Sequence, residues 1–198
     1  MVLLLHGRGG SAADILSLAP HLDPGGRLAF RAPQAAGNSW YPGSFLLPRE
    51  QNQPHLASAL SLVHRAIDGL TAAAPAGRVF VLGFSQGACL AAESVFSRGG
   101  AEPLGGVVCL TGGLIGDAVR IPEGGPRLER THVLLTGGDP DPHVPWTRVE
   151  ETASAYRGRG ATVDTHRFPR KPHGVTEEEL GLAAALIAGS PEGRHAFA

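Results

Sequence analysis

The stretch that decides the fold is GFSQGA, Gly83–Ala88, which lies between the apolar run RVFVL (Arg78–Leu82) and the alanine-rich run CLAAESVFS (Cys89–Ser97). It predicts a strand, a sharp turn and a helix, with Ser85 at the apex of the turn. In a G-x-S-x-G turn the serine takes a strained backbone conformation. A glycine two residues away on either side lets the strand and the helix pass closely.

A chain with 28 glycines could also contain this pattern by chance, as an ordinary surface turn. The apolar run before it and the helical run after it are what the strained turn requires, and they favour that interpretation. The turn would then place Ser85 at the amino end of a helix, where unpaired N–H groups and the helix dipole stabilise negative charge.

Outward from this turn, strand-like runs alternate with helix-like runs along the chain. Strands are expected at Val2–Leu5, Leu28–Ala32, Arg78–Leu82, Leu104–Leu110, Thr131–Thr136 and Ala161–Phe168, and helices at Ser11–Leu22, Gln53–Ala74, Cys89–Ser97, Trp146–Tyr156 and Thr176–Ala188. This alternation predicts an α/β fold with a mostly parallel sheet of about six strands and helices on both faces. Residues 1–189 are interpreted as one domain, and 190–198 as a mobile tail.

The composition excludes several classes of partner. A formal net charge of −1 with no sustained basic run gives no signature of nucleic acid binding or of attachment to an anionic membrane. The start MVLLLHG is too short an apolar run for a signal peptide or a membrane span, so we expect a cytoplasmic protein with no integral membrane segment. Cys89 and Cys109 are expected to be buried free thiols. Small molecules are the expected partners, and the sequence leaves a homodimer open.

Three segments interrupt the alternation, and the first is a loop of about twenty residues from Pro33 to Pro54. A loop of this length in a compact domain is usually functional or disordered. Its aromatic residues Trp40, Tyr41 and Phe45 argue against disorder. One interpretation is that these side chains only pack the loop onto the body of the domain. We favour the other, in which they line a substrate pocket.

The other two segments supply the partners that a nucleophilic serine needs. Asp139 and Asp141 lie in the loop Thr136–Trp146, directly after a strand, and His173 lies in the turn between the last strand and the last helix. An activated serine needs a histidine as base and a carboxylate that orients this histidine. The order serine, aspartate, histidine is the one found when such a site is built on an α/β sheet. Both aspartates satisfy it.

Four motifs together, LLHGRGGSA, GFSQGA, GGDPDPHVP and PHG, resemble the small carboxylesterase, phospholipase and acyl-protein thioesterase family of α/β-hydrolases. The resemblance covers nearly the whole chain and implies an α/β-hydrolase fold. It implies Ser85 as nucleophile, His173 as general base and Asp141 as the acid. It also implies an oxyanion hole formed by the backbone N–H groups of Arg8 and Gln86. The chain departs from the family in lacking an extra strand before LLHG, so the amino-terminal edge of the sheet is expected to be shortened.

The function implied is a serine carboxylic-ester hydrolase that acts on a small or acyl ester through an acyl-enzyme on Ser85. Two alternatives stay open: an acyl or acyl-protein thioesterase, and a catalytically weak ligand-binding sensor with the same fold. No metal or organic cofactor is expected, because H-E-x-x-H, C-x-x-C and G-x-G-x-x-G are all absent. If neither Asp141 nor Asp139 were the acid, Asp117 would be the remaining candidate.

Overall fold

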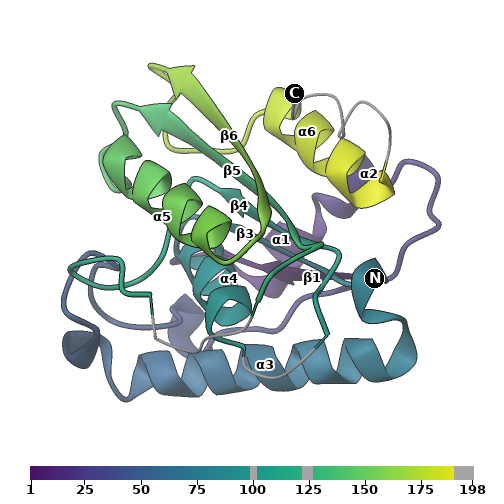
Figure 1. The fold of residues 1–198 in the computed structure, drawn as a ribbon, viewed down its shortest axis with the longest axis horizontal. Coiled ribbons are helices and arrows are strands. Elements are labelled where there is room, and N and C mark those ends of the chain that lie inside the picture. Colours follow the sequence, from purple (N-terminus) through teal and green to yellow (C-terminus); the bar gives the residue numbers. More distant parts are fainter. Residues whose placement is uncertain (99–101, 122–126, 190–198) are drawn as a thin grey trace.

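One six-stranded sheet forms the centre of the computed structural model, which describes residues 1–98, 102–121 and 127–189. The strand order is β2-β1-β3-β4-β5-β6, and every neighbouring pair is parallel (Figure 1). The strands are β1 (Val2–Leu5), β2 (Phe30–Arg31), β3 (Phe80–Phe84), β4 (Gly106–Leu110), β5 (His132–Asp139) and β6 (Thr162–Pro169). The predicted α/β-hydrolase fold is confirmed. The expected tail at 190–198 lies outside the described residues.

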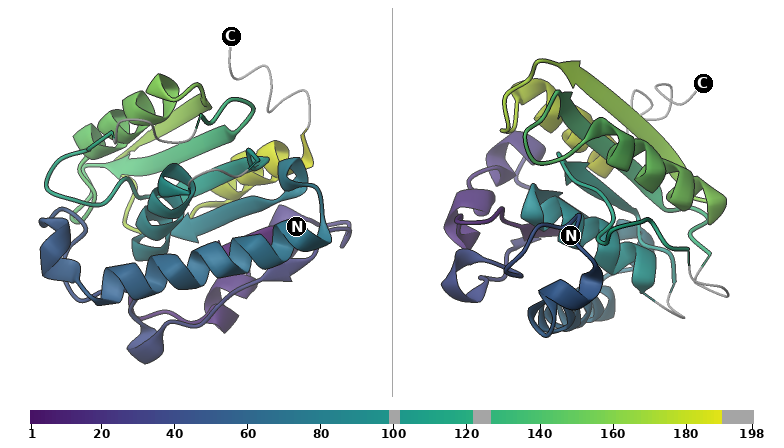
Figure 2. Two further views of the ribbon diagram at one scale, coloured as in Figure 1. Left: turned by 60° about the horizontal axis from the view of Figure 1, so that its bottom comes forward. Right: turned by 90° about the vertical axis from the view of Figure 1, so that its left-hand side faces the viewer.

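Helices cover both faces of the sheet (Figures 1 and 2). One face carries α3 (His55–Ala73), α4 (Gln86–Ser97) and α5 (Trp146–Gly158), and the other carries α1 (Ala12–Leu16), α2 (Ala19–Leu22) and α6 (Glu177–Ala188). Because successive strand residues point to opposite faces, β1 sends Leu3 into the first core and Leu4 into the second. The central strands are therefore buried on both sides, as their continuous apolar runs predict.

The helix expected over Ser11–Leu22 is in fact two short helices, α1 and α2. Pro20 lies in the first turn of α2. Its ring has no N–H and excludes the carbonyl one turn earlier, so a continuous helix cannot pass through it. The start of the segment is as expected, because Ser11 and Asp14 form a capping box with both reciprocal hydrogen bonds.

The second strand is also shorter than expected, since only two residues of the run 28–32 pair with the sheet. Phe30 is opposite Val2 and Arg31 is opposite Leu3, at the sheet edge next to β1. The long loop after β2 contains two short 3₁₀ turns, Ala36–Asn38 and Arg49–Asn52, which sequence periodicity did not indicate. Because all the strands are parallel, the loops that follow β1, β2, β3, β5 and β6 leave the sheet at the same edge.

Candidate active site

The turn after β3 holds Ser85 in the strained conformation that the G-x-S-x-G pattern predicts. The backbone of Ser85 has φ 54° and ψ −118°, a region that residues with a side chain rarely adopt. The two glycines make the approach of strand and helix sterically feasible. A Cβ at Gly83 would lie 2.2 Å from the carbonyl oxygen of Gly87, and a Cβ at Gly87 would lie 2.1 Å from that of Leu5.

His173 lies in the turn between β6 and α6 and reaches the serine. Its Nε2 is 2.9 Å from Ser85 Oγ, and its Nδ1 is 2.8 Å from Asp141 Oδ2. The imidazole is packed between aromatic rings, with ring centroids 5.3 Å from Phe84 and 4.9 Å from His143. The neighbouring His143 was not singled out from the sequence. Its position two residues after an aspartate in the acid loop was the available signal.

Asp141 is held as a carboxylate by its surroundings. The side chain is fully buried, and its Oδ1 accepts hydrogen bonds from the backbone N–H groups of His143 and Val144, each at 2.9 Å. Burial alone would raise the pKa of Asp141. The hydrogen bonds from His143, His173 and Val144 outweigh burial, so the pKa lies below its ordinary value. A carboxylate in this place fixes the His173 tautomer in which Nδ1 carries the proton and Nε2 accepts one.

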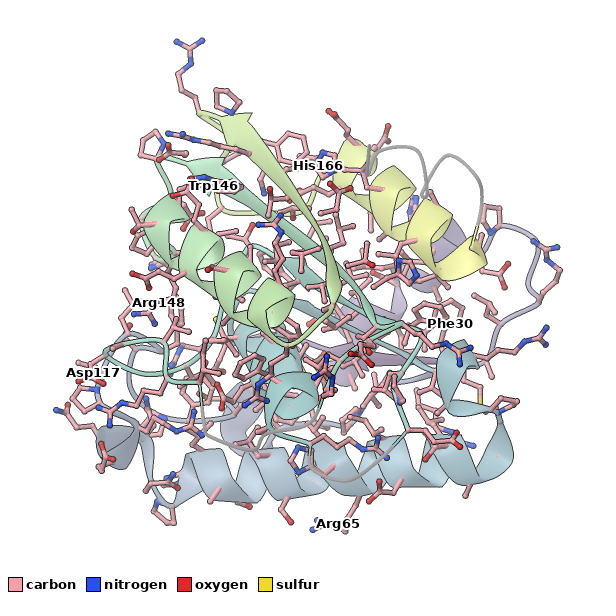
Figure 3. All side chains as sticks on the ribbon, in the orientation of Figure 1. Phe30, Arg65, Asp117, Trp146, Arg148 and His166 are labelled. Carbon is pink, nitrogen blue, oxygen red and sulfur yellow. The ribbon has the colours of Figure 1, made fainter. Side chains whose placement is uncertain are left out.

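The other two aspartates considered from the sequence lie elsewhere. Asp139 is the last residue of β5, and its carboxylate pairs with Arg167 of the neighbouring strand. Asp117 pairs with Arg120 at 3.2 Å and lies at the outer edge of the molecule (Figure 3). Of the three carboxylates, only that of Asp141 contacts His173.

The two residues implied as an oxyanion hole, Arg8 and Gln86, border the same space as Ser85. Because β1 and β3 are neighbours with Leu5 opposite Gly83, the residues that follow these strands, Arg8 and Gln86, both line the cavity beside the serine. Within residues 1–98, 102–121 and 127–189, neither backbone N–H donates to a protein acceptor. Gln86 is also the first residue of α4, so its N–H lies at the positive end of the helix.

The side chain of Gln86 has a structural role that sequence reasoning missed. Its Oε1 accepts the Trp40 backbone N–H at 3.0 Å, and its Nε2 donates to the Tyr41 carbonyl at 2.7 Å. The Trp40 indole N–H donates to the His6 carbonyl at 2.8 Å, and its ring lies 4.8 Å from the imidazole of His6. These contacts fasten the loop after β2 to the ends of β1 and α4.

A cavity of about 720 Å³ opens next to Ser85 and His173. Tyr41 and Phe45 belong to its wall, together with apolar side chains such as Leu46 and Val144. Trp40 does not line it, which corrects the expectation for this residue. The side chain is only 4% exposed and is turned towards the end of β1 by its bond to the His6 carbonyl.

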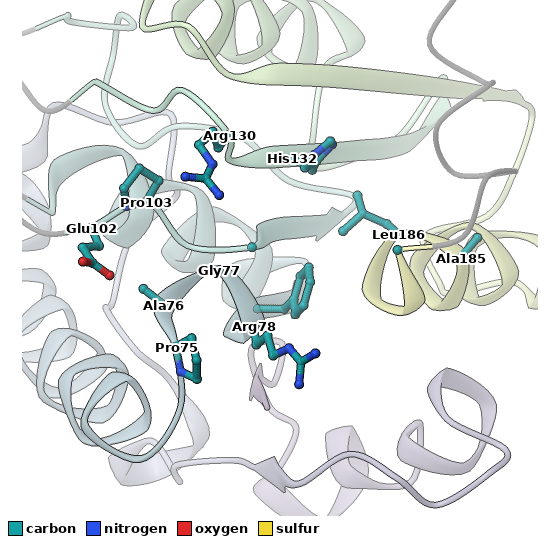
Figure 4. A pocket seen from close by; sticks show the side chains of 13 residues that line it. Pro75, Ala76, Gly77, Arg78, Glu102, Pro103, Arg130, His132, Ala185 and Leu186 are labelled. Atoms are coloured by element: carbon teal, nitrogen blue, oxygen red, sulfur yellow. The ribbon is translucent and has the colours of Figure 1, made fainter.

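A second cavity, of about 840 Å³, lies at the opposite ends of the strands (Figure 4). It is bordered by the first residues of β3 and β5, by the glycine that precedes β4 and by the end of α6. Its polar side chains are Arg78, Glu102, Arg130 and His132. None of the residues described around it carries a hydroxyl or a thiol. The cavity beside Ser85 is therefore the candidate active site, although it is the smaller of the two.

A buried ion pair supports the turn that carries His173. Lys171 Nζ lies 3.1 Å from Glu179 Oε2, and the two side chains are 4% and 0% exposed. The same ammonium donates to the Thr111 hydroxyl at 3.2 Å and to the Gly174 carbonyl at 2.5 Å. Gly174 directly follows His173. The ion pair therefore ties the histidine turn to the end of β4 and to the first turn of α6.

Glu179 has further partners that keep it in place. Its Oε1 accepts the Thr136 hydroxyl at 2.6 Å, and its Oε2 accepts the Thr176 backbone N–H at 2.9 Å. Thr176 and Glu179 form a capping box at the start of α6. One carboxylate thus begins a helix and binds a buried cation at the same time.

Both cysteines are buried and free, as expected. Burial raises the pKa of the Cys89 thiol to about 12 and raises the pKa of Cys109 as well. Among the described residues, no three His, Cys, Asp or Glu side chains are grouped so that they could hold a metal ion. No helix in this part of the chain is long and apolar enough to span a bilayer.

Comparison with known proteins identifies the family. A family model described as phospholipase/carboxylesterase matches residues 1–189. The crystal structure of a phospholipase/carboxylesterase from Dyadobacter fermentans is 42% identical, with a TM-score of 0.87, and the match covers 94% of this chain and 88% of that one. A search of curated proteins finds no match.

More distant solved structures share the fold. SOBER1 from Arabidopsis thaliana is 20% identical over 95% of this chain and 97% of that one, with a TM-score of 0.78. A Bacillus cereus carboxylesterase is 22% identical over 96% and 87% of the two chains, with a TM-score of 0.74. At these identities the likeness supports the fold alone.

Proposed function

Because this chain belongs to the phospholipase/carboxylesterase family of α/β-hydrolases, we propose that it is a serine hydrolase of carboxylic esters with Ser85 as nucleophile. The observation that carries the proposal is the unbroken chain of contacts from Ser85 Oγ through His173 to Asp141, at 2.9 and 2.8 Å. These lengths are within hydrogen-bonding distance, which is the geometric requirement for a nucleophile and its base.

Acylation proceeds from this arrangement. His173 Nε2 takes the proton of Ser85 Oγ as the oxygen attacks the carbonyl carbon of the ester. Asp141 orients the imidazole and stabilises its charged form. The backbone N–H groups of Arg8 and Gln86 stabilise the tetrahedral oxyanion, and each such donor contributes roughly 3 to 4 kcal/mol in other serine hydrolases. When the intermediate collapses, the bond to the leaving group breaks and His173 gives its proton to the departing alcohol.

Deacylation repeats the chemistry with water. His173 Nε2 removes a proton from a water molecule, whose oxygen attacks the carbonyl carbon of the acyl-serine. The bond to Ser85 Oγ then breaks, the proton returns to the serine, and the carboxylic acid leaves. The turn conformation of Ser85 and the buried ion pair beside His173 hold the serine hydroxyl and the imidazole next to each other in both half-reactions.

The experiment is a panel of p-nitrophenyl esters and acyl thioesters of graded chain length, tested on the natural chain and on Ser85→Ala. Ester hydrolysis that disappears in Ser85→Ala, while the circular dichroism spectrum is unchanged, is the expected result. Ser58→Ala, on the exposed side of α3, is the matched control and should keep full activity. Near-normal turnover in Ser85→Ala would contradict the assignment. A preference for thioesters would favour the thioesterase alternative.

The sensor alternative is separated by a second measurement. A fluorophosphonate phosphonylates an activated serine: the serine oxygen bonds to phosphorus, fluoride leaves, and the residue gains the mass of the phosphonyl group. Labelling at Ser85 together with turnover of the esters supports the hydrolase. Labelling with saturable ester binding and no turnover would favour the sensor, and no labelling would contradict activation of Ser85 by His173.

A further inference from the structure

Arg8, in the turn after β1, presents an uncompensated positive charge at the edge of the catalytic cavity. Its side chain is exposed and donates to the carbonyl oxygens of Pro42 and Gly43, at 2.8 and 2.6 Å, and to the Ser39 hydroxyl at 3.1 Å. All three acceptors are neutral. Arg8 takes part in no ion pair within the part of the chain that the structure describes.

The described residues that line the cavity do not neutralise this charge. Arg8 is the one lining residue with a permanent charge, and no aspartate or glutamate is among the described residues that border the space. The nearest catalytic carboxylate, Asp141, is buried and already bonded to His173 and to two backbone N–H groups. The whole chain has a formal net charge of −1, so attraction of an anion to this cavity would be local.

The guanidinium also has donors to spare. Arginine has five N–H donors, and the three bonds to the loop occupy three of them. The ring of Tyr41, whose centroid is 6.0 Å from the Arg8 Cζ, lies under the guanidinium and helps to hold its orientation. A guanidinium fixed in this way and still able to donate fits a carboxylate, a phosphate or a sulfonate.

We infer that the preferred substrates of this enzyme carry an anionic group, which the Arg8 guanidinium binds while the ester carbonyl lies at Ser85. The inference rests on the proposed esterase function and adds the charge class of the substrate. The competing explanation is that Arg8 only braces the loop 39–43. If Arg8 were only a brace, its loss would lower kcat/KM for charged and uncharged esters by the same factor. If Arg8 binds an anion, its loss lowers kcat/KM more for the charged esters.

The test uses two matched pairs of esters, which place the charge on either side of the scissile bond. On the acyl side, p-nitrophenyl hemisuccinate is compared with its methyl-capped, uncharged form. On the leaving-group side, 6-sulfonato-2-naphthyl acetate is compared with 2-naphthyl acetate. For each pair the quantity measured is the ratio of kcat/KM for the charged ester to kcat/KM for the neutral one. A substitution at Arg8 could also disturb the oxyanion hole, to which the Arg8 backbone belongs. Such damage would lower kcat/KM for both esters of a pair by the same factor, so the ratio would not change.

The expected ratio in the natural chain is roughly 3 to 10 for at least one pair, because an exposed ion pair with hydrogen bonds contributes modestly. It should fall towards 1 in Arg8→Gln and as salt is raised from about 0.02 to 0.5 M, because exposed charges are screened. Arg8→Lys should retain part of it. Arg65→Gln, on the outer side of α3 (Figure 3), removes the same charge away from the cavity and should leave the ratio unchanged.

Ratios that are the same in the natural chain and in Arg8→Gln would overturn the inference while leaving the esterase intact. If instead no ester is hydrolysed, the proposed function fails, and binding then decides the inference. Calorimetry of p-nitrophenyl hemisuccinate with Ser85→Ala and with Ser85→Ala/Arg8→Gln should show binding weakened about 3- to 10-fold in the double variant. Equal binding by the two variants would contradict an anion site at Arg8.

Discussion

Lys171→Met removes the cation from a carboxylate that the fold buries completely. In the native chain Glu179 Oε2 lies 3.1 Å from Lys171 Nζ, and neither side chain is more than 4% exposed. Removing one partner of a buried pair leaves the other uncompensated, which destabilises a protein by about 3 to 5 kcal/mol. For a domain of this size that corresponds to a fall in melting temperature of about 6 to 20 °C.

A double-mutant cycle isolates the interaction. Glu179→Gln should also destabilise strongly, because it leaves the ammonium buried without a counter-charge and weakens the bond to Thr136. The double variant Lys171→Met/Glu179→Gln should lose at least about 1.5 kcal/mol less than the sum of the two single variants. The assay is urea denaturation followed by circular dichroism. Arg120→Met, at the exposed pair with Asp117, is the control and should cost less than about 1 kcal/mol.

Catalysis supplies a second measurement on the same variants. Lys171 Nζ holds the carbonyl of Gly174, the residue after His173, so its loss should displace the base relative to Ser85. We therefore expect Lys171→Met to lower kcat more than it raises KM. Single variants that each cost under about 1 kcal/mol and add without coupling would refute the reasoning, because a buried pair cannot then be what holds the turn.

Four further predictions concern the other parts of the site. Asp141→Asn should lower turnover on the order of 10⁴-fold because the amide permits the wrong imidazole tautomer. Asp139→Asn should change turnover less than about tenfold. The reverse ranking of the two variants in kcat/KM would reassign the acid. The Asp141 carboxyl has a pKa below its ordinary value of 3.8, so its contribution to stability is present above pH 3.8 and is lost as the pH falls through the lowered pKa. The difference in unfolding free energy between the natural chain and Asp141→Asn, measured by denaturation, should therefore shrink as the pH falls through that range. Gly87→Ala should destabilise the fold by about 3 kcal/mol or more, because the new Cβ meets backbone of β1 at 2.1 Å, and an unchanged urea midpoint would contradict the close approach. Trp40→Phe, which removes a buried indole hydrogen bond, should cost about 1 to 3 kcal/mol with no change in chain-length preference, whereas Phe45→Ala should change that preference in the ester panel.

The sequence was most informative where backbone geometry demands particular residues. G-x-S-x-G predicted the strained turn because only glycine fits at 83 and 87. Apolar runs with strand and helix periods predicted the layers of the sheet. The break at Pro20 was readable too, because proline excludes a continuous helix, but the apolar spacing of that segment concealed it.

Contacts between distant segments were not readable in the same way. Whether Asp139 or Asp141 faces His173 depends on where β5 ends, and the residues alone left both open; the family resemblance indicated Asp141. Trp40 is turned away from the cavity by a bond to the end of β1, thirty-four positions earlier in the chain. Lys171 lies in a basic, proline-containing loop that reads as solvent-exposed, and its burial depends on a carboxylate from α6.

The low reactivity of the two native thiols has a practical consequence for spectroscopy. Cys89 and Cys109 are the only cysteines in the sequence, and both are buried with raised pKa values, so almost no thiolate is present at neutral pH. A cysteine introduced at Ser58, on the exposed side of α3, would therefore react with a maleimide dye without removal of either native residue. The chain accepts a single fluorophore or spin label in this way, with the catalytic residues unaltered.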